Sequence, residues 1–384
     1  MTSADSIEPF EVTVDSDAVE DLRERLERAR WPDQLPEAGW AYGTEREALR
    51  SLCTYWREEF DWAAFEDRCN AFDQYVTTID GGRIQFYHVR SPEPSATPVL
   101  LSHGWPGSVA EFVDVLGPLA DPAAHGGDPE DAFHVVAPSL PGFGFSGPTT
   151  EPGWDVPRMA DAVATLMDRL GYDRYLVQGG DWGALIAALL GATYPERVDA
   201  IHTTMLFVTP SSLEEPMDLL DEQGRADYER TKRFQGEESA YFEVQATTPQ
   251  SIAYGLTDSP VGLAGWLLEK FHAWTDCDGD PASWIGRDRL LDTLSVYWLT
   301  ETIGSSMRVY AETDVGAAIP ESVGVPTGHA RYPAEIHRTP RGWAAEVYDL
   351  VYWADQPAGG HFPAMEVPDL FVSDLRSFAR EIQA

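Results

Sequence analysis

The chain has 384 residues, of which 43% are hydrophobic and 11% aromatic, and this is enough for one large hydrophobic core with further segments around it. The formal net charge of −37 argues against nucleic acid and anionic membranes as partners, because both are negatively charged themselves. No apolar run approaches the ~20 residues that span a bilayer, and the first residues lack the pattern of a signal peptide. The three cysteines match neither a disulfide framework nor a metal site, so we expect a cytoplasmic protein.

The acidic composition has two interpretations. Of the 27 Lys and Arg residues only Lys232 and Lys270 are lysines. An acidic, lysine-poor surface suits concentrated salt, where screening removes the self-repulsion. A bacterial-type protein with an arginine-biased composition would look the same, and the sequence does not separate the two.

Residues 1–72 are predicted to form an N-terminal segment with two helices. Asp17 and Glu20 have the spacing of a capping box. The apolar residues near it recur on one helical face: Val19, Leu22, Leu26 and Ala29. Trp31-Pro32 would end this helix, because proline cannot continue one, and a second helical pattern covers residues 44–60.

Residues 73–209 alternate between strand and helix patterns. Residues 75–79 and 84–89 are rich in β-branched and aromatic residues about a glycine turn, which predicts a hairpin. The further predicted elements are strands at 99–101, 133–137, 175–177 and 200–202 and helices at 159–170 and 184–190. This order indicates an α/β fold with a mostly parallel sheet and helices on both faces.

The alternation stops in residues 210–319, which are helical and rich in aromatic residues. It returns in residues 320–384, with strands at 323–325 and 347–353 and a helix at 369–382. A helical insert late in such a sheet is typical of a cap over the carboxyl ends of the strands, where ligands bind. We therefore predict four segments: 1–72, a first core part (73–209), a helical cap (210–319) and a second core part (320–384).

A strand, a glycine-lined turn and a helix meet at Gly179-Gly180-Asp181-Trp182-Gly183. This is the pattern of the nucleophile elbow of the α/β-hydrolase fold, in which a sharp turn pushes one side chain into a cleft. Most such hydrolases have serine there, but the chain contains no G-x-S-x-G, and Asp181 takes the place. The alternative is a plain turn in which Asp181 caps the next helix.

A second motif, Ser102-His103-Gly104-Trp105-Pro106-Gly107-Ser108, follows a predicted strand. Its position suits an oxyanion hole, formed by the backbone amides of Trp105 and Trp182. We expect His103 to shape this loop and the Trp105–Pro106 bond to be cis, as in a tight turn.

The fold requires the order nucleophile, acid, histidine. His361, in Gly359-Gly360-His361-Phe362, is the histidine in the right place. Glu335 fits best as the acid, and Asp349 and Asp355 remain as alternatives.

With these motifs the chain resembles the microsomal-type epoxide hydrolases of the α/β-hydrolase superfamily over nearly its whole length. The motifs that carry the resemblance are Trp31-Pro32 within an N-terminal meander, HGWPGS (103–108), PSLPGFGFS (138–146), GGDWG (179–183), DSPVGLA (258–264) and GGHF (359–362). The resemblance implies Asp181 as nucleophile, His361 as base and Glu335 as acid. It also implies two ring-opening tyrosines, Tyr241 and Tyr310. The membrane-bound members carry an anchor helix that has no counterpart here, so membrane attachment is not expected.

The implied reaction converts a small hydrophobic epoxide into a vicinal diol through an ester on Asp181, without a metal or organic cofactor. Two other interpretations stay open. A haloalkane dehalogenase would use the same aspartate but needs halide donors in place of the lid tyrosines, and a catalytically silent member would only bind a hydrophobic ligand. The sequence does not identify the epoxide, a role in detoxification or biosynthesis, or the oligomeric state, a homodimer included.

Overall fold

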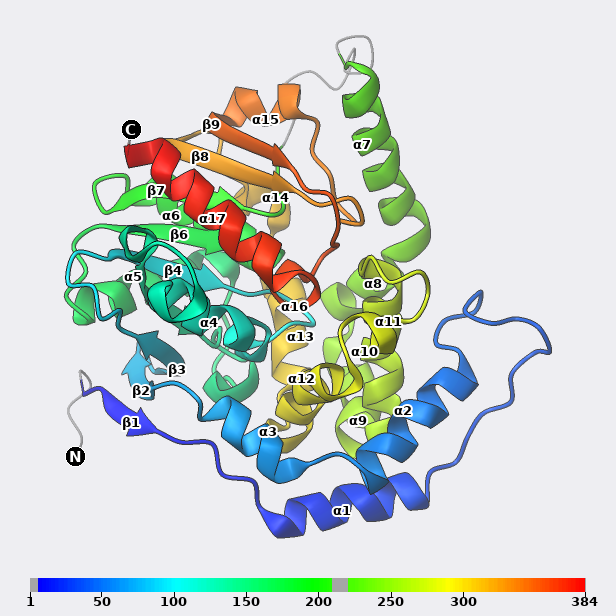
Figure 1. The fold of residues 1–384 in the computed structure, drawn as a ribbon. Helices are drawn as coiled ribbons and strands as arrows, with labels where there is room; N and C mark the ends of the chain where they lie inside the picture. The colour runs from blue at the N-terminus through cyan, green and yellow to red at the C-terminus, as the bar shows by residue number, and fades with distance from the viewer. Residues whose placement is uncertain (1–5, 209–219, 384) are drawn as a thin grey trace.

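The computed structural model describes residues 6–208 and 220–383 (Figure 1). The strands are β1 (Glu8–Phe10), β2 (Gln74–Ile79), β3 (Gly82–Val89), β4 (Thr97–Ser102), β5 (Phe133–Pro138), β6 (Tyr175–Gly179), β7 (Val198–Thr203), β8 (Val323–Arg331) and β9 (Tyr348–Asp355). The α-helices are α1 (Ser16–Glu27), α2 (Arg46–Glu58), α3 (Trp62–Cys69), α4 (Val113–Ala120), α5 (Val156–Arg169), α6 (Trp182–Thr193), α7 (Glu222–Arg233), α8 (Ala240–Thr247), α9 (Pro249–Asp258), α10 (Pro260–Trp274), α11 (Pro281–Trp284), α12 (Arg287–Thr300), α13 (Ile303–Glu312), α14 (Val315–Ala318), α15 (Arg341–Val347), α16 (Pro363–Glu366) and α17 (Pro368–Gln383).

In the described part of the chain the strands form one sheet in the order β1-β2-β3-β5-β4-β6-β7-β8-β9. The pairings from β1 to β5 are antiparallel, and those from β5 through β4 to β9 are parallel. The central strands β4 and β6 are short apolar runs because both of their faces are buried. The predicted mostly parallel sheet and the predicted hairpin, β2–β3, are confirmed.

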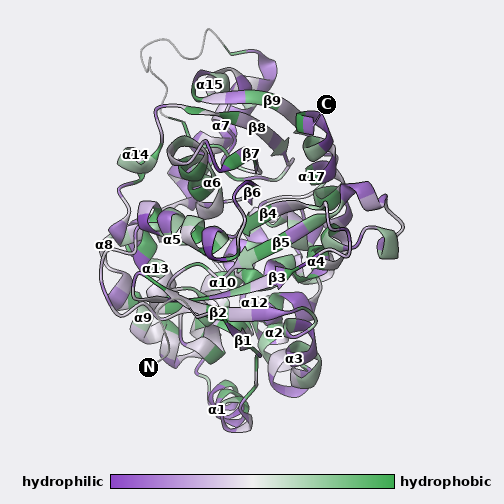
Figure 2. Cartoon of the chain, turned by 90° about the vertical axis from the view of Figure 1, so that its left-hand side faces the viewer, coloured by the Kyte–Doolittle hydropathy of each residue, from purple (hydrophilic) through white to green (hydrophobic). Residues whose placement is uncertain are grey.

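Helices cover both faces of this sheet (Figure 2). α5 packs with α6 on one face, and α4 packs with α17 on the other. α6 contacts strands β4, β6, β7 and β8. It is hydrophobic on nearly all sides and mostly buried, and its first residue, Trp182, follows Asp181 in the chain. The carboxyl ends of β4 and β6 and the start of α6 therefore meet at one place.

Helices α8 to α13 pack on one another beside the sheet, and the N-terminal helices support them (Figure 1). α1 and α2 contact α10. The buried indole of Trp56 donates to Ser295 Oγ at 3.1 Å, and Arg68 makes two hydrogen bonds to Asp292, at 2.6 and 2.9 Å. The N-terminal segment thus contacts both α10 and α12.

Several details differ from the prediction. The N-cap of α1 is Asp15, which accepts from the amide of Asp17, so the capping box at Asp17 and Glu20 was wrong. α1 ends at Glu27, before Trp31-Pro32, and the short strand β1 and helix α3 lacked a clear pattern in the sequence. Residues 210–219 of the predicted cap lie outside the described residues, and the limits of the four segments stay predictions. No helix in the described ranges has the length and apolar character that a membrane span requires.

Candidate active site

Asp181 lies at the turn between β6 and α6. Its backbone has φ 52° and ψ −127°, a strained conformation for a residue with a side chain, of the kind that persists where a fold over-determines it. Asp181 occupies the N-cap position of α6, but its side chain makes no capping hydrogen bond. It points instead toward the ends of neighbouring strands, as a nucleophile elbow requires.

The loop after β4 brings a backbone amide to Asp181. The Trp105 amide donates to Asp181 Oδ1 at 2.7 Å, and this close approach requires glycine at position 104, where a Cβ would collide with the Asp181 carboxyl. His103 holds the loop in shape, since its Nδ1 lies 3.0 Å from the Gly104 carbonyl and its Nε2 accepts from the Leu140 amide. The role expected for His103 and the cis Trp105–Pro106 bond are both confirmed.

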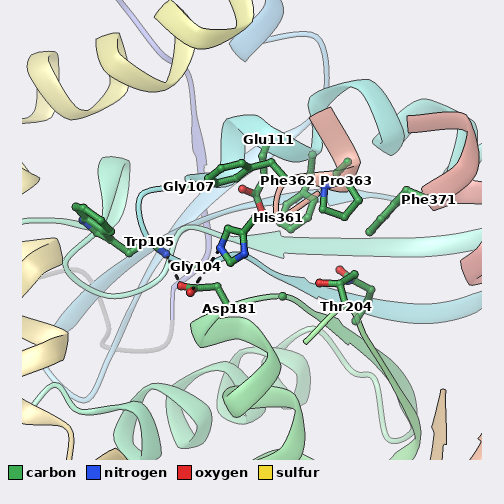
Figure 3. Close-up of a pocket in the computed structure, with 14 residues that line it drawn as sticks. Gly104, Trp105, Gly107, Glu111, Asp181, Thr204, His361, Phe362, Pro363 and Phe371 are labelled. Carbon is green, nitrogen blue, oxygen red and sulfur yellow. Dashed lines mark hydrogen bonds and ion pairs between the residues drawn. The ribbon is translucent and has the colours of Figure 1, made fainter. Parts of the chain in front are cut away.

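His361 lies between two carboxylates. Its Nε2 is 3.6 Å from Asp181 Oδ2 (Figure 3), and its Nδ1 is 2.9 Å from Glu335 Oε1. The His361 and Glu335 side chains are each only 2% exposed. Glu335 Oε1 also accepts from the Ile336 amide at 2.7 Å, so the acid that orients the imidazole is itself fixed.

The two alternative acids are far less suited to this place. Asp349 is exposed on β9. Asp355, at the end of β9, forms an ion pair with Arg331 at 3.2 Å, and its side chain is 67% exposed. Of the three acids considered from the sequence, the structure brings only Glu335 to His361.

Burial and charge shift the pKa values of this group strongly. For His361, burial lowers the pKa, but the carboxylates of Glu335, Asp181 and Glu111 outweigh it and raise the value to about 9. For Asp181, burial raises the pKa, while His361 and the backbone amides of Trp105 and Trp182 oppose the rise. Burial also raises the pKa of Glu335, but the charge of His361 and two backbone hydrogen bonds lower it more, so the pKa lies below its ordinary value. The carboxylates on both sides of His361 therefore favour its protonated form.

Tyr241 and Tyr310 line an apolar cavity that reaches Asp181. Tyr241 of α8 is 5% exposed and Tyr310 of α13 is 3% exposed, and their ring centroids are 5.9 Å apart. The cavity offers about 70 Å³ for the centre of a water-sized molecule, and its other walls are mostly apolar: Trp182, Met205, Phe207, Phe234, Phe242, Val315 and Ile336, together with His337. Burial and the charge of Asp181 raise the pKa of Tyr241 well above its ordinary value, so the phenol keeps its proton.

A second cavity also borders Asp181 (Figure 3), and we call it the polar cavity because polar side chains line part of it. It offers about 20 Å³ for the centre of a water-sized molecule, and ~10–15 Å³ is enough for one water. His361, Glu111 and Gln178 line it, and Gln178 Oε1 is a buried acceptor without a partner among the described residues. Of the residues that line the two cavities, only Asp181 borders both.

Glu111 is the residue of this site that the sequence interpretation missed. A Cβ at Gly107 would collide with its carboxyl, so the glycine makes room for it. Burial raises the pKa of Glu111 to about 8, and the charge of His361 acts in the opposite direction. The signal in the sequence was an acid within the otherwise apolar stretch 109–113, just after the motif at residues 102–108.

Comparisons with known proteins show the family to which the chain belongs. Residues 7–112 match the model of the epoxide hydrolase N terminus, and residues 97–248 match that of the alpha/beta hydrolase fold. A protein of Stigmatella aurantiaca is 44% identical over 98% of this chain and 86% of its own. Epoxide hydrolase 1 of Oryctolagus cuniculus is 34% identical over 97% of this chain and 89% of its own. The chain belongs to the epoxide hydrolase family.

Solved structures of the epoxide hydrolase family have the same fold. The crystal structure of juvenile hormone epoxide hydrolase from the silkworm Bombyx mori gives a TM-score of 0.89 at 32% identity and covers 98% of this chain and 95% of its own. The structure of Aspergillus niger epoxide hydrolase gives a TM-score of 0.88 at 31% identity, with 98% and 97% covered. The predicted resemblance to this family and the predicted α/β-hydrolase fold are confirmed.

Proposed function

We propose that this chain hydrolyses a small hydrophobic epoxide to a vicinal diol. The observation that carries the proposal is the position of Asp181 between two different cavities. One is apolar and holds two buried phenols, and the other, the polar cavity, holds His361 among polar and apolar side chains. A carboxylate at such a junction can attack a substrate from one side and be released by water from the other.

In the first half-reaction the epoxide occupies the apolar cavity. A carboxylate oxygen of Asp181 attacks one ring carbon, the carbon–oxygen bond breaks, and its electrons stay on the oxygen. Tyr241 and Tyr310 hydrogen-bond this oxygen, and one of them gives it a proton. The products are an ester on Asp181, a hydroxyl on the substrate and a phenolate.

Ester formation prepares the second half-reaction. The charge of Asp181 is one of the causes that raise the pKa of His361, and an ester carries no charge. The imidazolium therefore releases its proton to solvent more readily. The phenolate takes up a proton from solvent and becomes a phenol again. The neutral imidazole that results is the base that the next step requires.

In the second half-reaction His361 takes a proton from a water in the polar cavity, and the hydroxide attacks the ester carbonyl of Asp181. The amides of Trp105 and Trp182 stabilise the oxyanion. The alkoxide that leaves takes the proton of the new carboxylic acid, which gives the diol, the Asp181 carboxylate and the imidazolium. Glu111 and Gln178 orient the water, which explains polar groups in a cavity this small.

Two measurements test the proposal. Asp181→Ala is expected to abolish diol formation from a styrene-type epoxide, whereas Asp349→Ala, an exposed acid on β9, keeps it. In a single turnover of the wild type in heavy-oxygen water, the label is expected in Asp181 and not in the first diol. Label in the first diol would mean direct attack by water and would overturn the ester.

The same preparation distinguishes the dehalogenase interpretation. Halide release from haloalkanes, measured in parallel, is expected to be negligible beside epoxide opening. A halide leaving group needs no proton, so the two buried tyrosines favour the epoxide. Efficient halide release without diol formation would reverse this assignment.

A further inference from the structure

Lys270 of α10 is a buried lysine in contact with Tyr241. It is 4% exposed, and its ammonium lies 4.4 Å from the centroid of the Tyr241 ring. The rings of Trp266 and Trp274 lie 5.6 and 5.7 Å from the same ammonium. The other lysine of the chain, Lys232 of α7, is exposed. The one buried ammonium among the described residues is thus placed on the face of a phenol that borders Asp181.

Lys270 forms a close ion pair with its neighbour Glu269. Burial lowers the pKa of Lys270, and the charge of Glu269 opposes this lowering without cancelling it. A buried charge is costly unless it is paired, and Glu269 supplies the pair from the partly exposed side. The stacked indole of Trp105, 5.3 Å from the Tyr241 ring, leaves the phenol little freedom to move away from the ammonium.

A cation over an aromatic ring is attracted by the electrons of that face. The attraction increases when a phenol loses its proton, because the negative charge of a phenolate is shared between its oxygen and its ring. Such an interaction is small in the resting enzyme and large at the moment of proton transfer, and only interactions of this kind accelerate a chemical step.

We propose that Lys270 stabilises the phenolate that forms when Tyr241 gives its proton to the epoxide oxygen, and that this makes Tyr241, rather than Tyr310, the proton donor. The inference rests on the proposed function and deepens it. Lys270 acts through Tyr241 and is a positioning residue. In this step the O–H bond of Tyr241 breaks, and its proton goes to the epoxide oxygen whose bond to carbon is broken by the attack of Asp181. The electron pair of the O–H bond remains on the phenolate until solvent returns a proton.

The surroundings of Tyr310 differ in the way that this inference requires. Its ring packs against Trp105, Trp182 and Phe242, at centroid distances of 5.8, 4.8 and 5.0 Å. Within residues 6–208 and 220–383, no cation stacks on it. A phenolate at Tyr310 would not be stabilised by a stacked cation, so the Tyr310 hydroxyl stabilises the alkoxide by a hydrogen bond alone.

The test is a double-mutant cycle on the rate of ester formation, measured by rapid quench and intact mass with a styrene-type epoxide. Lys270→Met, which keeps the length of the side chain, is expected to slow ester formation about tenfold, the equivalent of ~1.4 kcal/mol. In the Tyr241→Phe background the same change is expected to have an effect below about twofold, and in the Tyr310→Phe background the full tenfold loss. Lys232→Met is the control for the loss of one positive charge.

A purely structural role for Lys270 would give the same loss in both tyrosine backgrounds, and this result would overturn the inference. Glu269→Gln provides a second check that does not depend on the folding of Lys270→Met. Burial already lowers the pKa of Lys270, and removal of the Glu269 carboxylate lowers it further. Ester formation is therefore expected to slow relative to wild type at neutral pH and to approach the wild-type rate at lower pH, where Lys270 regains its proton. A rate equal to that of wild type at every pH would contradict an electrostatic role. If Tyr241→Phe alone has no effect on ester formation, Tyr241 is not the proton donor and the inference about Lys270 fails. The ester on Asp181, measured in the same samples, shows separately whether the proposed function holds.

Discussion

Substitution of Glu335 by glutamine would test the division of the reaction into two steps. Glu335 Oε1 lies 2.9 Å from His361 Nδ1 and also accepts from two backbone amides. A glutamine carbonyl can keep these hydrogen bonds, so the change removes the charge and largely preserves the shape. Its effect on His361 is therefore electrostatic.

The size of the effect follows from the pKa of His361. Burial lowers this pKa, Glu335 is the largest of the causes that raise it, and the result is about 9 in place of the ordinary 6.5. That difference corresponds to ~3 kcal/mol in favour of the imidazolium. Once Asp181 is an ester, Glu335 is the main remaining support for the positive charge that His361 acquires from water. We expect Glu335→Gln to slow ester hydrolysis by ~10²-fold, the equivalent of ~3 kcal/mol, and ring opening much less.

The assay is a single turnover with acid quench, in which intact mass reports the ester on Asp181. The ester is expected to accumulate in Glu335→Gln and to decay slowly. Asp355→Asn makes the same chemical change on an exposed acid that pairs with Arg331, and should leave both steps unchanged. Hydrolysis within about twofold of wild type in Glu335→Gln, or a loss confined to ring opening, would refute the reasoning.

Three further predictions concern other parts of the molecule. Glu111 has a folded pKa of about 8 against an ordinary 4.5, so the folded state binds the extra proton and the wild type loses stability as pH rises between these values. Glu111→Gln should therefore gain unfolding free energy relative to wild type across that window, by up to ~1.4 kcal/mol for each pH unit in urea titrations, and a difference independent of pH would contradict the burial of this acid. Tyr241→Phe and Tyr310→Phe should each slow ester formation, and the double variant should be nearly inactive with ester hydrolysis little changed; a double variant that opens epoxides at the wild-type rate would remove the tyrosines from the mechanism. If the acidic composition is an adaptation to salt, melting temperature should rise from low to molar salt, and a flat series would favour the compositional interpretation.

The parts of the site that were predictable from the sequence are those that short motifs encode. A sharp turn between a buried strand and a buried helix needs glycines and leaves one side chain in front of the helix, so Asp181 could be identified from five consecutive residues. His361 and the Trp105 loop followed in the same way, because each lies directly after a strand of the sheet. The assignment of Glu335 as the acid was less certain. Its pairing with His361 depends on how the chain between them folds, and the two residues are 26 positions apart.

Glu111 and Lys270 were not predictable as functional residues, because their roles depend on neighbours that are distant in the chain. Glu111 belongs to the segment after β4 yet acts on His361, which follows β9. Lys270 lies within an apolar helix and contacts a ring of another helix, α8. A charged residue inside an apolar stretch was the available signal in both cases. That pattern shows only that a charge is buried, and not what it faces.

The arrangement of two cavities around one carboxylate has a consequence for how such an enzyme can change. A substitution in the apolar cavity alters which epoxides fit and how they are oriented, but leaves the water, its base and its acid untouched. A substitution in the polar cavity does the reverse. Substrate range and turnover of the ester can therefore be selected separately, by evolution or in the laboratory, provided that Asp181 and its strained turn remain.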